Sequence, residues 1–146
     1  NRVIEVNPEH DIVWQYPQVL DPSKLSGAAF ASRLENGNTL ITDSNNNRII
    51  EVNHAGGLVW SFVTNTRPNS NPAPLPTRAV RLENGNTLIS DQFNDQVIEV
   101  THAGRIVFKQ GMINVPGAGF NHLNAPYDAK QIGDYTGLTP PFGEDD

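Results

Sequence analysis

Short apolar runs, either alternating with polar residues or rich in β-branched side chains, recur at even spacing along the chain and are bounded by turn-forming residues. Runs of this kind are typical of short β-strands. The dipeptides Asn36-Gly37 and Asn84-Gly85 each separate two such runs, and Asn-Gly is the strongest short-range signal of a hairpin turn. The pattern therefore predicts an all-β, antiparallel fold.

The sequence repeats itself after about 48 residues. The segment Arg-Leu-Glu-Asn-Gly-Asn-Thr-Leu-Ile occurs at residues 33–41 and again at 81–89. A second repeated segment, Ile-Glu-Val, occurs at residues 50–52 and 98–100, and it also opens the chain at residues 4–6. Repeats of this kind mark the structural units of a chain and have to be recognised before its fold is assigned.

Each complete unit is predicted to hold four strands. In the first complete unit they are Ala28–Leu34, Thr39–Thr42, Arg48–Val52 and Leu58–Phe62. In the second they are Thr77–Leu82, Thr87–Ser90, Gln96–Val100 and Arg105–Lys109. Four antiparallel strands in about 40–50 residues are typical of one β-propeller blade. Large aromatic residues recur on the fourth strand and are expected to pack between neighbouring blades: Trp14, Trp60 and Phe108.

The two ends of the chain hold incomplete units. We divide the chain into units at residues 1–27 (third and fourth strands only), 28–75, 76–125 and 126–146. The last unit is predicted to contain a first strand at Tyr127–Ile132 and a degenerate second strand within Asp134–Pro141. Together the units make about three blades, whereas closed propellers have about four to eight. We therefore expect a segment that is half of a six-bladed ring, completed by a second copy in a homodimer or by further blades of the same protein.

Composition narrows the classes of function. The net charge of −6 provides no basic patch for nucleic acid, and no apolar run approaches the length of a membrane span. Cysteine is absent, which excludes disulfide scaffolds and thiol catalysis. The chain begins at Asn1 without Met, so a lost leader is possible, and an extracellular or periplasmic location is our expectation.

Charged and ionisable residues at repeated positions are expected to be structural. The turn histidines are interpreted as surface turn residues: His10, His54 and His102. Asp43 and Asp91 follow the second strand of each unit, where they should accept backbone N–H bonds in a turn rather than bind Ca²⁺. Acidic residues on the third strands should pair with Arg or Lys across strands: Glu5, Glu51 and Glu99. We predict no metal and no cofactor.

Three connections between units depart from the repeat, and loops of this kind often carry function. They are Pro17–Ser26, Thr66–Pro76 and Asn114–Asn124, and we expect them to lie on one face. The leading interpretation is a non-catalytic module that binds a ligand or a protein through these loops. A structural subunit that assembles through its open strand edges is an alternative.

The pattern Asn-Gly-Asn-Thr-Leu-Ile-x-Asp, then Ile-Glu-Val-Asn, then Gly-x-Val-Trp resembles blades of the arylsulfotransferase-like propellers. It is also similar to NHL-repeat and pyrroloquinoline-quinone-type propellers. The first resemblance implies a six-bladed periplasmic enzyme that transfers a sulfuryl group through a channel histidine supported by further His and Arg. His122, within Asn121-His122-Leu123-Asn124, is the candidate catalytic residue under this alternative. The candidate ligand-binding residues are Arg33, Arg81, Asn124, Tyr127 and Asp128.

Overall fold

The Asn-Gly segments form the tight hairpin turns that the sequence predicts. In the first complete unit, the Leu34 N–H donates to the Asn38 carbonyl, 2.8 Å away, and Gly37 adopts a φ of 86°. The second unit repeats this geometry around Gly85, which has the same φ. This left-handed conformation favours glycine because any Cβ would be strained there. Both hairpins therefore fold as local units.

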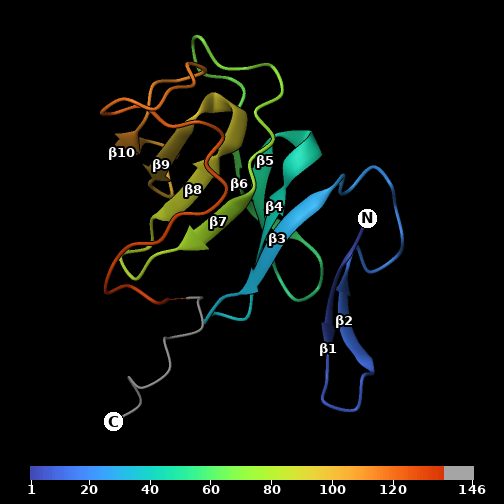
Figure 1. Cartoon of the computed structure of the whole chain (residues 1–146). Helices are drawn as coiled ribbons and strands as arrows, with labels where there is room; N and C mark the ends of the chain where they lie inside the picture. Colours follow the sequence, from blue (N-terminus) through green and yellow to red (C-terminus); the bar gives the residue numbers. More distant parts are fainter. Residues whose placement is uncertain (137–146) are drawn as a thin grey trace.

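The computed structural model describes residues 1–136, which form three antiparallel sheets (Figure 1). The first sheet is a hairpin of β1 (Val3–Val6) and β2 (Ile12–Tyr16). The second contains β3 (Ala28–Arg33), β4 (Thr39–Asp43), β5 (Arg48–Val52) and β6 (Leu58–Val63). The third contains β7 (Arg78–Arg81), β8 (Thr87–Asp91), β9 (Gln96–Val100) and β10 (Ile106–Gln110). In both four-stranded sheets the strands lie side by side in chain order, and each strand of the two complete units lies within one residue of its predicted bounds.

A short 3₁₀ turn joins the second and third strands of each complete sheet. These turns are η1 (Ser44–Asn46) and η2 (Gln92–Asn94). Each ends on a residue in the left-handed conformation, Asn47 with φ 54° and Asp95 with φ 56°. Asn and Asp tolerate this conformation better than other residues that carry a Cβ.

The sheets stack face to face, as blades do, and two apolar clusters fill the spaces between them. We call the face that a blade turns toward the next blade its leading face, and the opposite face its trailing face. Between the first and second blades the cluster is Trp14, Tyr16, Leu25, Ile41, Ile50 and Val52. Between the second and third blades it is Leu34, Leu40, Ile49, Trp60, Ala79, Ile89, Ile98 and Val100. Equivalent repeat positions therefore occupy the same side of each interface.

The aromatic residues of the fourth strands pack between blades, as predicted, wherever a following blade is present. Trp14 and Trp60 are buried, and their indole N–H groups donate to the backbone carbonyls of His54 and His102, at 2.9 and 2.8 Å. Each tryptophan thus bonds to the last turn of the blade that follows it. Phe108, at the same position of the third blade, is half exposed.

Glu5 and Glu51 on the third strands make their ion pairs between blades, which corrects the expectation of pairing within a sheet, and Glu99 instead accepts hydrogen bonds from the side chains of Asn84 and Asn86. Glu51 on β5 pairs with Arg81 on β7, with 2.8 Å between oxygen and nitrogen. The Arg81 guanidinium also lies 5.3 Å from the ring centroid of Trp60. Burial opposes ionisation of Glu51, but hydrogen bonds from Asn38 and Arg81 outweigh it and lower the pKa of its carboxyl. The pair therefore joins the third strand of the second blade to the first strand of the third blade.

The segment Tyr127–Ile132, predicted as a first strand, forms no strand in the structure. It lies beside the third blade, where the Thr77 hydroxyl donates to the Tyr127 carbonyl over 2.7 Å. The physical reason is that a strand needs a hydrogen-bonding neighbour, and no described strand lies alongside to supply one. The predicted second strand within Asp134–Pro141 falls mainly on residues 137–146, outside the described residues.

No helix within residues 1–136 has the length and apolar character required to cross a membrane.

Candidate functional site

The three variable connections lie at the same end of the sheets. Each first strand runs from a variable connection toward an Asn-Gly turn, so the two lie at opposite ends of the sheet. At the loop end, the carbonyl of Ser26 accepts a hydrogen bond from the N–H of Asn45 in η1, and the carbonyl of Pro74 accepts one from the N–H of Phe93 in η2. Asn114, in the third connection, donates its N–H to the last residue of η2. The loops are therefore anchored on the turns between second and third strands.

A repeated side-chain hydrogen bond fixes where each loop enters the next blade. The Asn47 side-chain oxygen accepts the N–H of Leu75 over 3.2 Å, and the Asp95 carboxylate accepts the N–H of Ala125 over 2.9 Å. The accepting residue ends a 3₁₀ turn, and the donating residue precedes the next unit. We call this contact the Asx latch. Its recurrence shows that the loop ends are held by the repeat even though the loop sequences vary.

The loop tips expose large apolar side chains that the repeat does not require. The exposed residues are Val19, Leu20, Met112, Val115 and Phe120. Phe120 is fully exposed. The connection from Gly111 to Pro126 carries no Asp, Glu, Lys or Arg, although the chain as a whole has a net charge of −6. The third connection is therefore less charged than the rest of the chain.

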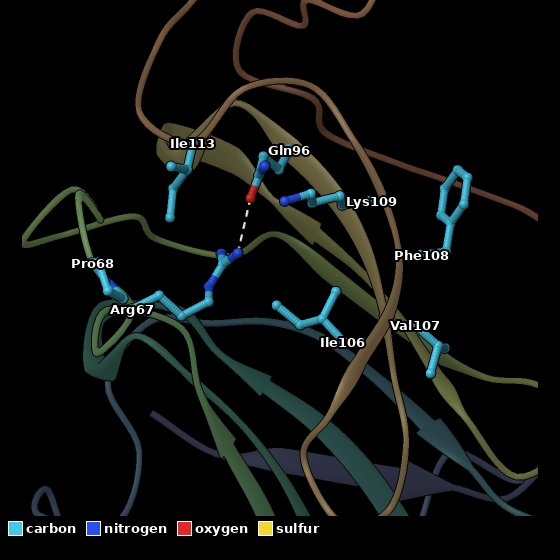
Figure 2. A pocket seen from close by; sticks show the side chains of 8 residues that line it. All are labelled: Arg67, Pro68, Gln96, Ile106, Val107, Phe108, Lys109 and Ile113. Atoms are coloured by element: carbon cyan, nitrogen blue, oxygen red, sulfur yellow. Dashed lines mark hydrogen bonds between the residues drawn. The ribbon is translucent and has the colours of Figure 1, made fainter.

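A groove of about 390 Å³ opens beside the second connection, against the outer strand β10 (Figure 2). Its lining residues are Arg67, Pro68, Gln96, Ile106, Val107, Phe108, Lys109 and Ile113. Arg67 donates to the Gln96 side chain over 2.9 Å, and Figure 2 shows Arg67 and Lys109 reaching toward Gln96 from two sides. Two cationic side chains thus face an apolar wall.

Arg67 also holds a carboxylate that is buried beneath the loops. Its guanidinium donates to Asp91 over 2.6 Å, and the Asn94 amide donates to the same carboxylate oxygen over 2.8 Å. The other oxygen of Asp91, Oδ1, is buried without a hydrogen-bond partner within the described residues. Burial raises the pKa of Asp91 to about 6, against the lowering effect of Asn94 and Arg67. Asp91 therefore does not make the backbone hydrogen bonds that we predicted for it.

Arg33 and Arg81, predicted to bind a ligand, lie at the opposite end of the sheets from the loops. Arg33 donates to the Gly37 carbonyl in the Asn-Gly turn and lies 4.6 Å from the ring centroid of Trp14. It also forms an ion pair with Glu5, as Arg81 does with the equivalent glutamate. Both arginines line a pocket of about 390 Å³ at this end. Their contacts show that they join adjacent blades.

Tyr127 and Asp128, two further predicted ligand residues, lie next to an arginine that the sequence analysis did not select. Arg78 Nε lies 3.1 Å from Asp128 Oδ1, and the Arg78 guanidinium lies 4.2 Å from the ring centroid of Phe30. Phe30, Arg78 and Asp128 hold equivalent positions in successive units, on the inner side of the stack. Arg78 was missed because its repeat equivalents are chemically unlike, so the repeat gave no signal of a shared role.

His122 and Asn124 lie in the third connection, away from both arginine clusters. The Nδ1 atom of His122 is buried without a hydrogen-bond partner in the described chain. Gly117 closes over the imidazole, since a Cβ at this position would lie 2.8 Å from Nδ1. The structure therefore separates His122 from Arg33 and Arg81 and does not assemble the predicted residues into one site. The roles of these residues stay predictions.

Comparison with known proteins gives the class of the fold. No protein-family model matches the sequence, and no curated protein is significantly similar to it. Among solved structures, virginiamycin B lyase from Staphylococcus aureus is similar, with a TM-score of 0.55, 19% identity, and coverage of 78% of this chain and 36% of the lyase. A catalytically inactive histidine-to-alanine variant of that lyase with quinupristin gives a TM-score of 0.54 at 19% identity, covering 80% of this chain and 36% of the variant.

A protein of unknown function from Bacteroides caccae is also similar, with a TM-score of 0.50, 18% identity, and coverage of 74% of this chain and 37% of that protein. At these identities the likeness shows the fold alone. The chain is thus a β-propeller segment built from blade repeats. It spans about a third of the length of the structures that it matches.

Proposed function

We propose that this chain is a non-catalytic propeller module that binds a partner through the variable loops at one end of its blades. The observation that carries the proposal is the set of exposed apolar side chains on those loops, above all Phe120. The buried apolar residues of the repeated strands are explained by blade packing, whereas Phe120 is fully exposed and takes no part in that packing. Exposed aromatic side chains on rigidly anchored loops are characteristic of binding surfaces.

The charge of the loop end favours a particular kind of partner. The sixteen-residue stretch from Gly111 to Pro126 has no charged side chain, so it would not attract nucleic acid or a strongly charged ligand. At the edge of the loop end, the groove adds Arg67 and Lys109 beside apolar residues. A peptide segment with apolar side chains and one acidic group would match both features.

The test uses a phage-displayed random peptide library selected on the purified chain. A selected peptide is titrated by calorimetry against the wild type, Phe120→Ser and Lys109→Ala. We expect each substitution to weaken binding by about tenfold or more, as truncating a central contact does, with little change in melting temperature. His54→Ala, at the opposite end of the blades, should bind as the wild type does.

Loss of binding in His54→Ala but not in Phe120→Ser would contradict this placement of the site. Failure to select any peptide that depends on Phe120 would contradict the proposal itself.

An arylsulfotransferase-like activity, suggested by the sequence resemblance, is the alternative proposal. It rests on the sequence resemblance, because the Nδ1 atom of His122 is buried and a nucleophilic nitrogen must be able to reach its substrate. Sulfuryl transfer would also need cationic groups at the sulfate oxygens, and no described Arg or Lys forms a hydrogen bond or ion pair with His122. We therefore expect no turnover of phenyl sulfate with a phenol acceptor. Turnover that disappears in His122→Ala would overturn the non-catalytic proposal.

A further inference from the structure

Arg78, on the first strand of the third blade, differs from the other half-buried arginines in its hydrogen bonds. Those arginines all donate to carboxylates inside the fold: Arg48, Arg67 and Arg81. The Arg78 side chain is only 22% exposed, yet its guanidinium donates no hydrogen bond within residues 1–136, and its Nε atom is buried without such a partner. Buried polar groups in proteins are normally hydrogen-bonded, so these open donors point to a partner outside the described chain.

Two neighbours from different units hold the Arg78 guanidinium in place. It lies 4.2 Å from the ring centroid of Phe30 on β3, and its Nε atom lies 3.1 Å from Oδ1 of Asp128. A guanidinium that packs on an aromatic ring and is paired at Nε has a fixed orientation. Its terminal edge, formed by Nη1 and Nη2, is therefore fixed as well and is not engaged by any described residue.

The charges around Arg78 leave an excess of one positive charge. Lys130 pairs with Oδ2 of Asp128, so two cationic side chains share one carboxylate. No other Asp or Glu in the part of the chain that the structure describes forms an ion pair with Arg78 or Lys130. A bound group with a single negative charge would balance this cluster.

The surroundings of Arg78 do not depend on where the sequence begins or ends. The unit before it contributes Phe30, and the segment after the third blade contributes Asp128 and Lys130. Blades of a propeller surround a central channel, and the first strands form its inner side. Further blades would stack on the trailing face of the first blade or beyond the third, and would leave this inner side as a channel wall.

We propose that Arg78 binds a small carboxylate ligand on the inner side of the first strands. Its Nη1 and Nη2 atoms would donate to the two carboxylate oxygens, and Lys130 would supply the second positive charge. A planar carboxylate matches the two parallel N–H groups of a guanidinium edge. Phosphate and sulfate also accept from such an edge, but a dianion exceeds the local excess of one charge, whereas a carboxylate balances it.

The test follows the side-chain nitrogen NMR signals of arginine while sodium acetate is titrated at constant ionic strength. Arg78→Gln identifies the Arg78 signal, and the exposed Arg105 reports general salt effects in the same sample. We expect the Arg78 signal to shift and to saturate at about 10 mM acetate, a modest affinity for so small a ligand. The Arg105 signal should not saturate, and sodium phosphate should bind Arg78 more weakly than acetate.

Variants separate the terminal edge from the charge, with the backbone amide signals of Asp128 and Lys130 as the readout. Arg78→Lys keeps the positive charge but loses the paired donors, and should weaken acetate binding about tenfold. Phe30→Leu removes the aromatic support and should weaken binding about threefold. Arg105→Lys is the matched control and should bind acetate as the wild type does. Melting temperatures confirm that each variant is folded.

An Arg78 signal that does not saturate with acetate would overturn the proposal, and so would equal binding by Arg78→Lys and Arg105→Lys. Tighter binding of phosphate than of acetate would contradict a carboxylate as the ligand. None of these variants alters the loops. Binding of a peptide that depends on Phe120 can therefore fail or succeed independently, and the two proposals are tested separately.

Discussion

At the residue scale, one proline explains why a buried oxygen of Asp91 has no hydrogen-bond partner. In the second blade the equivalent Asp43 accepts the N–H of Ser26 over 2.8 Å at Oδ1. In the third blade the repeat places Pro74 where Ser26 stands, and proline has no N–H to donate. Asp91 Oδ1 is therefore left without a partner, and burial without compensation disfavours the charged form. A single change in a variable loop thus alters the ionisation of a buried core residue.

This account predicts how stability depends on pH. The pKa of Asp91 is raised to about 6 in the folded chain, so the folded state binds a proton more readily than the unfolded state does. The resulting stabilisation is fully present below about pH 4 and is lost as the pH rises through about 6, a change of roughly 3 kcal/mol in the free energy of unfolding. Pro74→Ser should restore the N–H, lower the pKa of Asp91 and reduce this loss.

The measurement is a carboxyl-carbon NMR titration of Asp91, combined with urea unfolding at pH 5 and pH 7.5. Pro72→Ser, in the same loop but exposed, is the control for the general effect of removing a proline. If Pro74→Ser and Pro72→Ser leave the Asp91 titration equally unchanged, the missing N–H is not the cause.

At the scale of elements, the Asx latch connects each 3₁₀ turn to the start of the following unit. It occurs three times, since the Asn1 side chain also accepts the N–H of Gly27, over 2.6 Å. The latch needs a residue that tolerates the left-handed conformation and also has a side-chain oxygen one carbon from Cβ. Asn and Asp meet both conditions, which explains why Asn47 and Asp95 exchange at this position without loss of the contact.

Substitutions at Asn47 can separate these two requirements. Asn47→Asp should be as stable as the wild type within about 0.5 kcal/mol, because the third blade uses Asp here. Asn47→Gly keeps the backbone conformation but removes the acceptor from Leu75, and should cost about 1 kcal/mol. Asn47→Ala adds left-handed strain to that loss and should cost about 2 kcal/mol. Urea unfolding at one fixed protein concentration measures all three, and equal stability of Asn47→Gly and the wild type would show that the hydrogen bond contributes nothing.

At the scale of the whole molecule, the stacking of the blades decides which residues can act together. The first strands converge, since β7 contacts both β3 and β4, and the sheets diverge outward from there (Figure 1). Along these strands, Arg33 and Arg81 lie near the Asn-Gly turns, while His122 lies among the loops at the other end. The arginines and the histidine chosen from the sequence therefore cannot share one small substrate within this chain.

The same stacking gives the ion pairs a different role from the predicted one. The ion pair between Glu51 and Arg81 joins strands of two blades. The length of the repeat does not show whether a residue's partner lies in the same sheet or in the sheet of the next blade. The burial of Trp60 likewise depends on a following blade. At Phe108, where no described blade follows, the same repeat position is exposed.

The sequence by itself determined the units of this protein, because hairpin turns and strand alternation are local properties. Residues close together in the chain predicted the Asn-Gly turns and the strand bounds. The repeat predicted that Trp14 and Trp60 pack between neighbouring blades. The tertiary structure alone decided the contacts between units: the latch from Asn47 to Leu75, the support of Asp91 by Arg67, and the Arg78–Asp128 pair. These contacts join segments that differ from one unit to the next, and their geometry exists only once the sheets have stacked.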